Sequence, residues 1–237
     1  MQINTAPVNR GWDWITEGFA LFRLNPVIWI AIFVIYLVLA MLLSLIPFIG
    51  VIATLLLHPV LVGGMLLGCK ALQQGQELRI DHLFAGFSQN ASALVTVGLF
   101  TGAGYFLVVV IIGLLVGGGL GLSALGGYTD LPSIAIGGAM VAYLFSGLIG
   151  LALTVPIAMA AWFAPALVVF DNIQAWDAMK ASFSACLGNM LPFLLYGVAA
   201  LALTVVASIP FGLGMLVLGP TLVASIFSGY RDIFRAV

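Results

Sequence analysis

The chain has 237 residues, of which 63% are hydrophobic and only 6% are Asp, Glu, Lys or Arg. A soluble domain is about 25% charged, so this composition excludes an ordinary soluble fold. The 7 basic residues nearly balance the 8 acidic ones, which leaves no basic surface for a nucleic acid. The class that remains is a polytopic membrane protein.

Four long runs without Asp, Glu, Lys or Arg predict where the chain crosses the membrane. They cover residues 24–69, 83–129, 131–170 and 181–230. One helical crossing needs about 20 apolar residues, so the first and last runs each hold two, divided by Pro- and Gly-containing turns at 44–50 and 208–214. The predicted fold is all-α with six transmembrane helices, near residues 26–45, 50–69, 92–116, 138–169, 190–207 and 213–227.

The fourth predicted span is long, and breaks at Pro156 and Pro165 would leave two short spans as an alternative. The basic residues favour a single span. With six spans, all seven of them lie on one side of the membrane: Arg10, Arg23, Lys70, Arg79, Lys180, Arg231 and Arg235. The opposite loops then carry only Asp130. Because cytoplasmic loops are enriched in Lys and Arg, we expect both termini in the cytoplasm.

Three short segments align without gaps on the spacing of their apolar residues, which is typical of one face of a helix. The matched positions are Trp12, Ile15, Phe19, Phe22 and Asn25; Glu77, Ile80, Phe84, Phe87 and Asn90; and Trp176, Met179, Phe183, Cys186 and Asn189, the middle copy matching less well at its first position. A short amphipathic helix beside a crossing suits the headgroup layer, with its apolar face on lipid or on neighbouring spans. The alternative is that each segment simply extends a membrane helix into the cytoplasm. Asn25 and Asn189, which we call the Asn markers, are followed by Pro26 and Pro192. These prolines favour a break between the short helix and the membrane helix.

A proline inside a span recurs in each copy, at Pro59, Pro156 and Pro220, where we expect helix kinks. The sequence therefore predicts one transmembrane domain, residues 1–237, built from three helical-hairpin repeats. Their expected bounds are 11–74, 77–171 and 175–235. The second repeat is longer because it holds a Gly-rich insertion at 113–138, which we expect to form an extracytoplasmic loop or a re-entrant segment.

Residues 10–26, 162–170 and 178–197 resemble an uncharacterised family of proteobacterial multi-pass inner-membrane proteins, and the resemblance covers essentially the whole chain. More distantly, the pattern is similar to the membrane domain that accompanies some bacterial glycerophosphodiester phosphodiesterases, although no catalytic part of such an enzyme is present. The resemblance implies placement in the bacterial inner membrane. It assigns no reaction, ligand or site residue.

The chain offers little chemistry for catalysis. There are two histidines, no predicted span contains an acidic residue, and Cys69 and Cys186 lack the spacing of metal ligands. We therefore expect no enzyme activity, no catalytic residue, no cofactor and no metal. His58 is the sharpest candidate, because an ionisable group inside a span is costly and often functional, here as a proton-sensitive gate. The alternative is a neutral His58 bonded to a carbonyl freed by Pro59, or to a Ser or Thr of a neighbouring helix.

Two functions from different classes fit these observations. The first is a non-catalytic membrane scaffold, assembly partner or lipid-associated factor, with membrane lipids, a second copy or another membrane protein as partner. A lipid-headgroup site built from Arg10, Arg23, Lys70, Lys180 and Arg231 is the sharper form of this hypothesis. The second is a small oligomeric transporter or channel for a neutral or lipid-like solute, since repeats and Pro-broken helices are typical of transporters.

Overall fold

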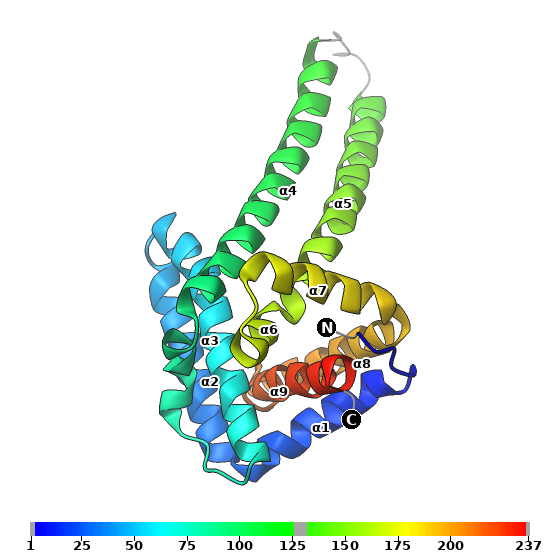
Figure 1. The fold of residues 1–237 in the computed structure, drawn as a ribbon. Helices are drawn as coiled ribbons and strands as arrows, with labels where there is room; N and C mark the ends of the chain where they lie inside the picture. The colour runs from blue at the N-terminus through cyan, green and yellow to red at the C-terminus, as the bar shows by residue number, and fades with distance from the viewer. Residues whose placement is uncertain (1–2, 126–131, 236–237) are drawn as a thin grey trace. The chain divides into compact units, whose positions relative to one another are not determined.

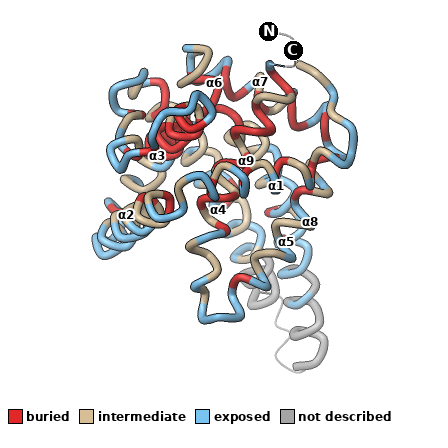
Figure 2. Tube along the Cα trace, turned by 90° about the horizontal axis from the view of Figure 1, so that it is seen from below, coloured by how far each residue is buried: buried red, intermediate tan, exposed pale blue. Residues whose placement is uncertain are grey.

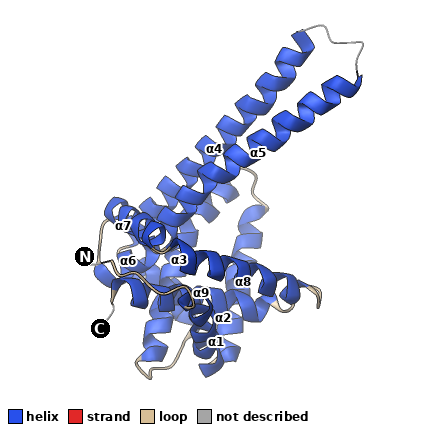
Figure 3. Ribbon diagram, turned by 90° about the vertical axis from the view of Figure 1, so that its right-hand side faces the viewer, coloured by secondary structure: helices blue, strands red, loops and turns tan. Residues whose placement is uncertain are grey.

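The computed structural model describes residues 3–125 and 132–235, without the side chains of residues 119–125, 132–139, 141 and 142. Within these ranges the chain forms helices and loops, with no strand (Figures 1 and 3). The helices are α1 (Arg10–Leu24), α2 (Pro26–Ser44), α3 (Ile49–Gln73), the 3-10 helix η1 (Ile80–Ser88), α4 (Ala91–Leu125), α5 (Pro132–Trp162), α6 (Ala164–Asp171), α7 (Ala175–Gly188), α8 (Met190–Ser208) and α9 (Met215–Phe234).

Five stretches of the described chain are long and apolar enough to cross a membrane, which confirms an all-α membrane protein. They are Pro26–Ser44, Ile49–Gln73, Ala91–Gly118, Tyr143–Asp171 and Met190–Ser208. These stretches correspond to the first five predicted spans, and the fourth remains a single stretch although the helix is interrupted at Phe163. Helix α9 forms where the sixth span is expected, but it carries Arg231 and Asp232 near its C-terminal end and is not among the five. A sixth crossing stays a prediction.

The described residues of the Gly-rich segment 113–138 are helical, so they do not form the expected loop, whereas a re-entrant or extracytoplasmic placement stays a prediction. Helix α4 continues to Leu125 and α5 begins at Pro132, so most of this segment is helical. Asp130 lies outside the described residues. Although glycine costs about 1 kcal/mol in a helix relative to alanine, an apolar run without water satisfies its backbone polar groups best as a helix. The glycine content alone was therefore a poor guide to the backbone here.

The breaks at the Asn markers are confirmed. Helix α1 ends before Asn25 and α2 begins at Pro26, while α7 ends before Asn189 and α8 begins one residue later. The Asn25 side chain accepts a hydrogen bond from the backbone N–H of Ile28, so it caps α2 in the usual manner of an Asn N-cap.

The contacts divide the chain into two compact units. One comprises Met1–Leu99 with Met159–Val237, and the other comprises Phe100–Ala158. The first unit holds the main hydrophobic core, in which Trp14, Phe163 and Tyr230 are almost fully buried. Figure 2 shows buried residues concentrated on α3, α6, α7 and α9. The second unit lies wholly inside the predicted second repeat.

Helix α1 packs tightly along α9 and α8 (Figure 1). Its buried residues are Gly11, Trp14, Ile15, Gly18 and Phe22. A Cβ atom placed on Gly18 would lie 2.5 Å from the carbonyl oxygen of Thr221, so only glycine permits this approach of two backbones. Trp14 fills the adjoining space, with its ring centroid 5.3 Å from that of Phe193.

Each of the two other short helices packs on the helix that precedes it in the chain. Helix η1 lies against α3, where a Cβ atom on Gly86 would meet the backbone of Val60. Helix α7 lies against α6, and one of its side chains bonds to the backbone at Phe163, where the preceding helix is interrupted. The Phe163 N–H donates to the hydroxyl of Ser182 (2.9 Å), which in turn donates to the carbonyl of Met159 (2.6 Å). Ser182 thus satisfies both backbone groups left free by the break.

The predicted apolar faces of the short helices are divided between core and surface. Ile15, Phe22 and Met179 are buried, Phe183 is half-buried, and the exposed members are Trp12, Phe19, Ile80, Phe84, Phe87 and Trp176. The predicted apolar face of α1 did not include Trp14, because the face that the structure buries also contains Gly11 and Gly18, which give no hydrophobic pattern. Contact of the exposed members with lipid stays a prediction.

Candidate anion-binding site at three helix ends

A pocket of about 550 Å³ lies where the C-terminal ends of α3, α6 and α9 meet. Its lining residues are Lys70 and Gln73 from α3, Phe170 from α6, and Phe227, Tyr230, Arg231, Asp232 and Arg235 from α9 and its C-terminal end. The volume is in the range of small-molecule sites, which is about 300 to 1,000 Å³. We refer to this feature as the helix-end pocket.

The helix-end pocket lies at an end of two candidate spans. The stretch Ile49–Gln73 ends at the α3 side of the pocket, and the stretch Tyr143–Asp171 ends at its α6 side. Two spans that end together place their last turns at one membrane–water boundary. A ligand of this pocket would therefore meet both water and the headgroup layer.

The guanidinium of Arg235, an exposed side chain, is paired with a carboxylate of the same chain. It donates to Asp171 Oδ1 at 2.9 Å and, through Nε, to the phenolic oxygen of Tyr230 at 2.9 Å. Tyr230 donates its own hydroxyl proton to Asp171 Oδ2. Burial, followed by the hydrogen bond to Asp171, raises the pKa of Tyr230, and the hydrogen bond that Arg235 donates to Tyr230 raises the pKa of Arg235. Arg235 and Asp171 thus form an ion pair with each other at the edge of the pocket.

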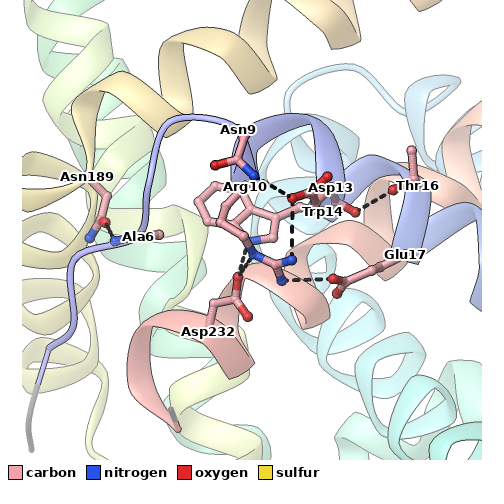
Figure 4. Close-up of polar contacts among 9 residues, drawn as sticks. All are labelled: Ala6, Asn9, Arg10, Asp13, Trp14, Thr16, Glu17, Asn189 and Asp232. Atoms are coloured by element: carbon pink, nitrogen blue, oxygen red, sulfur yellow. Dashed lines mark hydrogen bonds and ion pairs between the residues drawn. The ribbon is translucent and has the colours of Figure 1, made fainter.

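The carboxylate of Asp232 is engaged by α1 (Figure 4). Trp14 Nε1 donates to Asp232 Oδ2 at 2.7 Å, and Arg10 Nε donates to the same oxygen. The other side of the Arg10 guanidinium donates to Glu17 at 2.8 Å. The hydrogen bond with Asp232 raises the pKa of Arg10, which therefore stays charged. Asp232 lines the pocket, and its carboxylate shares the Arg10 guanidinium with Glu17 and Asp13.

Lys70 and Arg231 are the cations of the pocket that have no carboxylate within ion-pair distance among the described residues. Both lie over aromatic rings instead. Lys70 Nζ is 5.6 Å from the ring centroid of Phe170, and the guanidinium carbon of Arg231 is 5.8 Å from that of Phe227. The two rings pack edge to face, with centroids 5.6 Å apart. Two cations without a carboxylate partner thus lie over the same pair of packed rings, in the last turns of α3 and α9, where an added anion could pair with both.

The remaining cations of the predicted headgroup set lie elsewhere. Arg10 is held by carboxylates, and Lys180 pairs with Asp177 at 2.8 Å. Arg23 lies over Phe19 and does not line the helix-end pocket. Only Lys70 and Arg231 of the five therefore come together. The pairing pattern that separates them depends on tertiary contacts, which no spacing in the sequence reveals.

His58 lies in α3 and shares a hydrogen bond of 2.9 Å with the hydroxyl of Tyr36 in α2. The partner is on a neighbouring helix, as the structural alternative supposed, although it is a tyrosine and not Ser or Thr. Both side chains line an apolar pocket of about 170 Å³, together with Phe84 and Phe87 of η1. This pocket has no charged lining residue, and a gating role for His58 stays a prediction.

The in-span prolines lie inside helices, as expected: Pro59 in α3, Pro156 in α5 and Pro220 in α9. Pro59 and Pro220 are buried, whereas Pro156 is exposed. The kinks expected at the three positions stay a prediction.

The fold and the apolar helices define an integral membrane protein of the helical class. A curated protein of Burkholderia thailandensis, named a probable inner membrane protein, is 31% identical over 226 residues, which cover 91% of this chain and 80% of that relative. The chain belongs to the family of this bacterial inner-membrane protein. No family model matches the chain, and no solved structure matches it. The more distant similarity to phosphodiesterase membrane domains stays a prediction.

Proposed function

We propose that the chain is a non-catalytic, lipid-associated protein of the bacterial inner membrane that holds an anionic phospholipid headgroup in the helix-end pocket. The observation that carries this proposal is the pair Lys70 and Arg231, two cations without a carboxylate partner in one pocket at the end of two candidate spans. A scaffold role follows from the same feature, because a bound lipid would link three helices.

The two cations should add a modest but measurable amount to the binding free energy of an anionic lipid. A basic residue near an anionic membrane surface contributes about 1 kcal/mol, so two contribute roughly 2 kcal/mol, or about a thirty-fold difference in affinity. Cations stacked on aromatic rings are partly desolvated, which increases their attraction for a ligand that excludes water. Since both side chains are half-buried, little conformational freedom is lost when a headgroup binds.

The proposal includes six spans in three hairpin repeats, with α9 as the sixth span and both termini in the cytoplasm. The packing of each short helix supports it: α1 on α9, η1 on α3 and α7 on α6. Each short helix would thereby rest on the last helix of another repeat, in a closed ring. The helix-end pocket would then lie where the ends of all three repeats meet. Reporter fusions at the two termini test the orientation, and an extracytoplasmic terminus would contradict it.

A thermal-shift experiment tests the lipid site. The purified protein is titrated in a neutral detergent with phosphatidylglycerol or with phosphatidylcholine, and its melting temperature is followed. We expect phosphatidylglycerol alone to raise the melting temperature, and the double variant K70Q/R231Q to lose this effect. K180Q is the matched control, because Lys180 is a basic residue of the same chain that already pairs with Asp177. An equal response of the double variant and the wild type would refute the site.

A further inference from the structure

We propose that the helix-end pocket prefers a phospholipid with a terminal phosphomonoester over one with a phosphodiester headgroup. This inference rests on the proposed anionic-lipid function and names the ligand class. It follows from the two cations of the pocket that have no carboxylate partner, from the hydrogen-bond donors of its lining, and from the position of the pocket at the end of the spans.

The charge of the pocket can be counted from the groups that face it. Helix α3 contributes Lys70, the end of α6 contributes Asp171, and α9 with its C-terminal end contributes Arg231, Asp232 and Arg235. Arg235 is paired with Asp171, and Asp232 is paired with the guanidinium of α1 described above. Among the described residues, Lys70 on α3 and Arg231 on α9 are thus the two cations of the pocket without a carboxylate within ion-pair distance.

A phosphomonoester matches this charge better than a phosphodiester. It carries about −1.5 to −2 charges at pH 7, since its second pKa is about 6, and it presents three acceptor oxygens. A phosphodiester in the same place carries a single negative charge. The lysine ammonium, the arginine fork and the Gln73 amide at the pocket are all hydrogen-bond donors, and a terminal phosphate can accept from each of them.

The structure favours a lipid as the source of this phosphate. The pocket lies at the last turn of α3 and the end of α6, both of which terminate candidate spans. Its floor is built from Phe170 and Phe227, whose rings pack against each other. A phosphate at this boundary with its glycerol backbone toward the apolar spans fits that polarity, whereas a free phosphate would leave the aromatic floor uncovered.

Competition measured by native mass spectrometry tests the preference. The wild-type protein is mixed with equimolar phosphatidic acid and phosphatidylglycerol of identical acyl chains at pH 7.5, and the bound ratio is read from the adduct masses. One additional compensated charge predicts about a five-fold preference for phosphatidic acid. K70Q and R231Q should each reduce the ratio toward one, whereas K180Q should keep it. Equal melting temperatures of the variants in lipid-free detergent show that they fold.

The pH dependence separates this inference from the broader one. Neither histidine lines the pocket, so between pH 5 and 8 the main titrating group there is the phosphate itself. We expect the preference to fall toward one as the pH drops below about 6. If the two lipids bind the wild type equally at pH 7.5 and neither binds K70Q/R231Q, the phosphomonoester preference is overturned. The anionic-lipid site remains supported by that result. Binding of both lipids that is independent of Lys70 and Arg231 overturns the two together. Displacement of the lipid by millimolar glycerol 3-phosphate overturns the lipid source.

Discussion

Replacing Gly18 by valine should detach α1 from α9. A Cβ atom at this position would lie 2.5 Å from the carbonyl oxygen of Thr221 and 2.7 Å from the backbone nitrogen of Ser225. Ordinary contacts begin near 3.4 Å, so α1 must move away by about 1 Å, and a gap of that size forfeits up to about half of the dispersion energy of the facing atoms. Overpacking of this kind costs about 1 to 3 kcal/mol. For a chain of this length we expect the melting temperature to fall by about 3 to 10 °C.

The matched control is valine at Gly197, a helical glycine of α8 with no atom within 4 Å of its ideal Cβ position. Both variants carry the same change in helix propensity, so the difference between them reports packing alone. A thiol-reactive dye follows unfolding in detergent, because Cys69 and Cys186 are buried and free in the folded chain. Equal melting temperatures for the two valine variants would show that α1 is not docked on α9 as described.

Three further changes test contacts around the same core. Asp232→Asn should lower the stability by about 1 to 3 kcal/mol, because it weakens charged hydrogen bonds to α1, whereas Asp81→Asn at an exposed ion pair should change it little. Ser182→Ala should cost about 1 to 3 kcal/mol, because it leaves the Phe163 N–H without its acceptor and the Met159 carbonyl with only the weak Cys186 thiol as side-chain donor, and Ser184→Ala, at an exposed position of the same helix, should be nearly neutral; equal melting temperatures would contradict the role of Ser182 at the break. Burial raises the pKa of Cys186 to about 12, so at pH 8 only about one thiol in 10,000 is ionised, and maleimide labelling should be slow until the protein is unfolded; rapid labelling of the folded chain would refute this burial.

The membrane helices could be predicted closely because hydropathy and turn residues act locally. The predicted span at 26–45 compares with Pro26–Ser44 in the structure, and the predicted break after Asn25 lies at the observed position. Of the two alternatives for residues 113–138, the loop was wrong for the described residues, because a weak local preference of glycine yields to the need to satisfy backbone groups in an apolar run. The buried face of α1 was predicted only in part: Ile15 and Phe22 are buried, but Trp14 and the two glycines of that face were not among the matched positions. Glycine positions contribute no hydrophobic signal, yet Gly18 sets the closest helix approach.

The helix-end pocket could be predicted only in part. Lys70 and Arg231 were among the expected headgroup cations, but the sequence could not separate them from Arg10, which is neutralised. Arg231 and Asp232 are neighbours in the chain, and successive residues of a helix point about 100° apart. Asp232 therefore reaches α1, while Arg231 lies over Phe227. Which cation remains free is decided by tertiary packing, and spacing in the sequence carries no information about it.

The most direct test of the central claim is to locate a bound headgroup on the chain. A phospholipid with a photoactivatable group on its anionic headgroup is crosslinked to the protein in nanodiscs, and the modified peptides are mapped by mass spectrometry. We expect adducts concentrated on residues 66–76 and 226–235, and we expect them to disappear in K70Q/R231Q but not in K180Q. Adducts spread along the exposed basic residues, including Arg79 and Lys180, and unchanged in the double variant, would contradict a specific site at the helix ends.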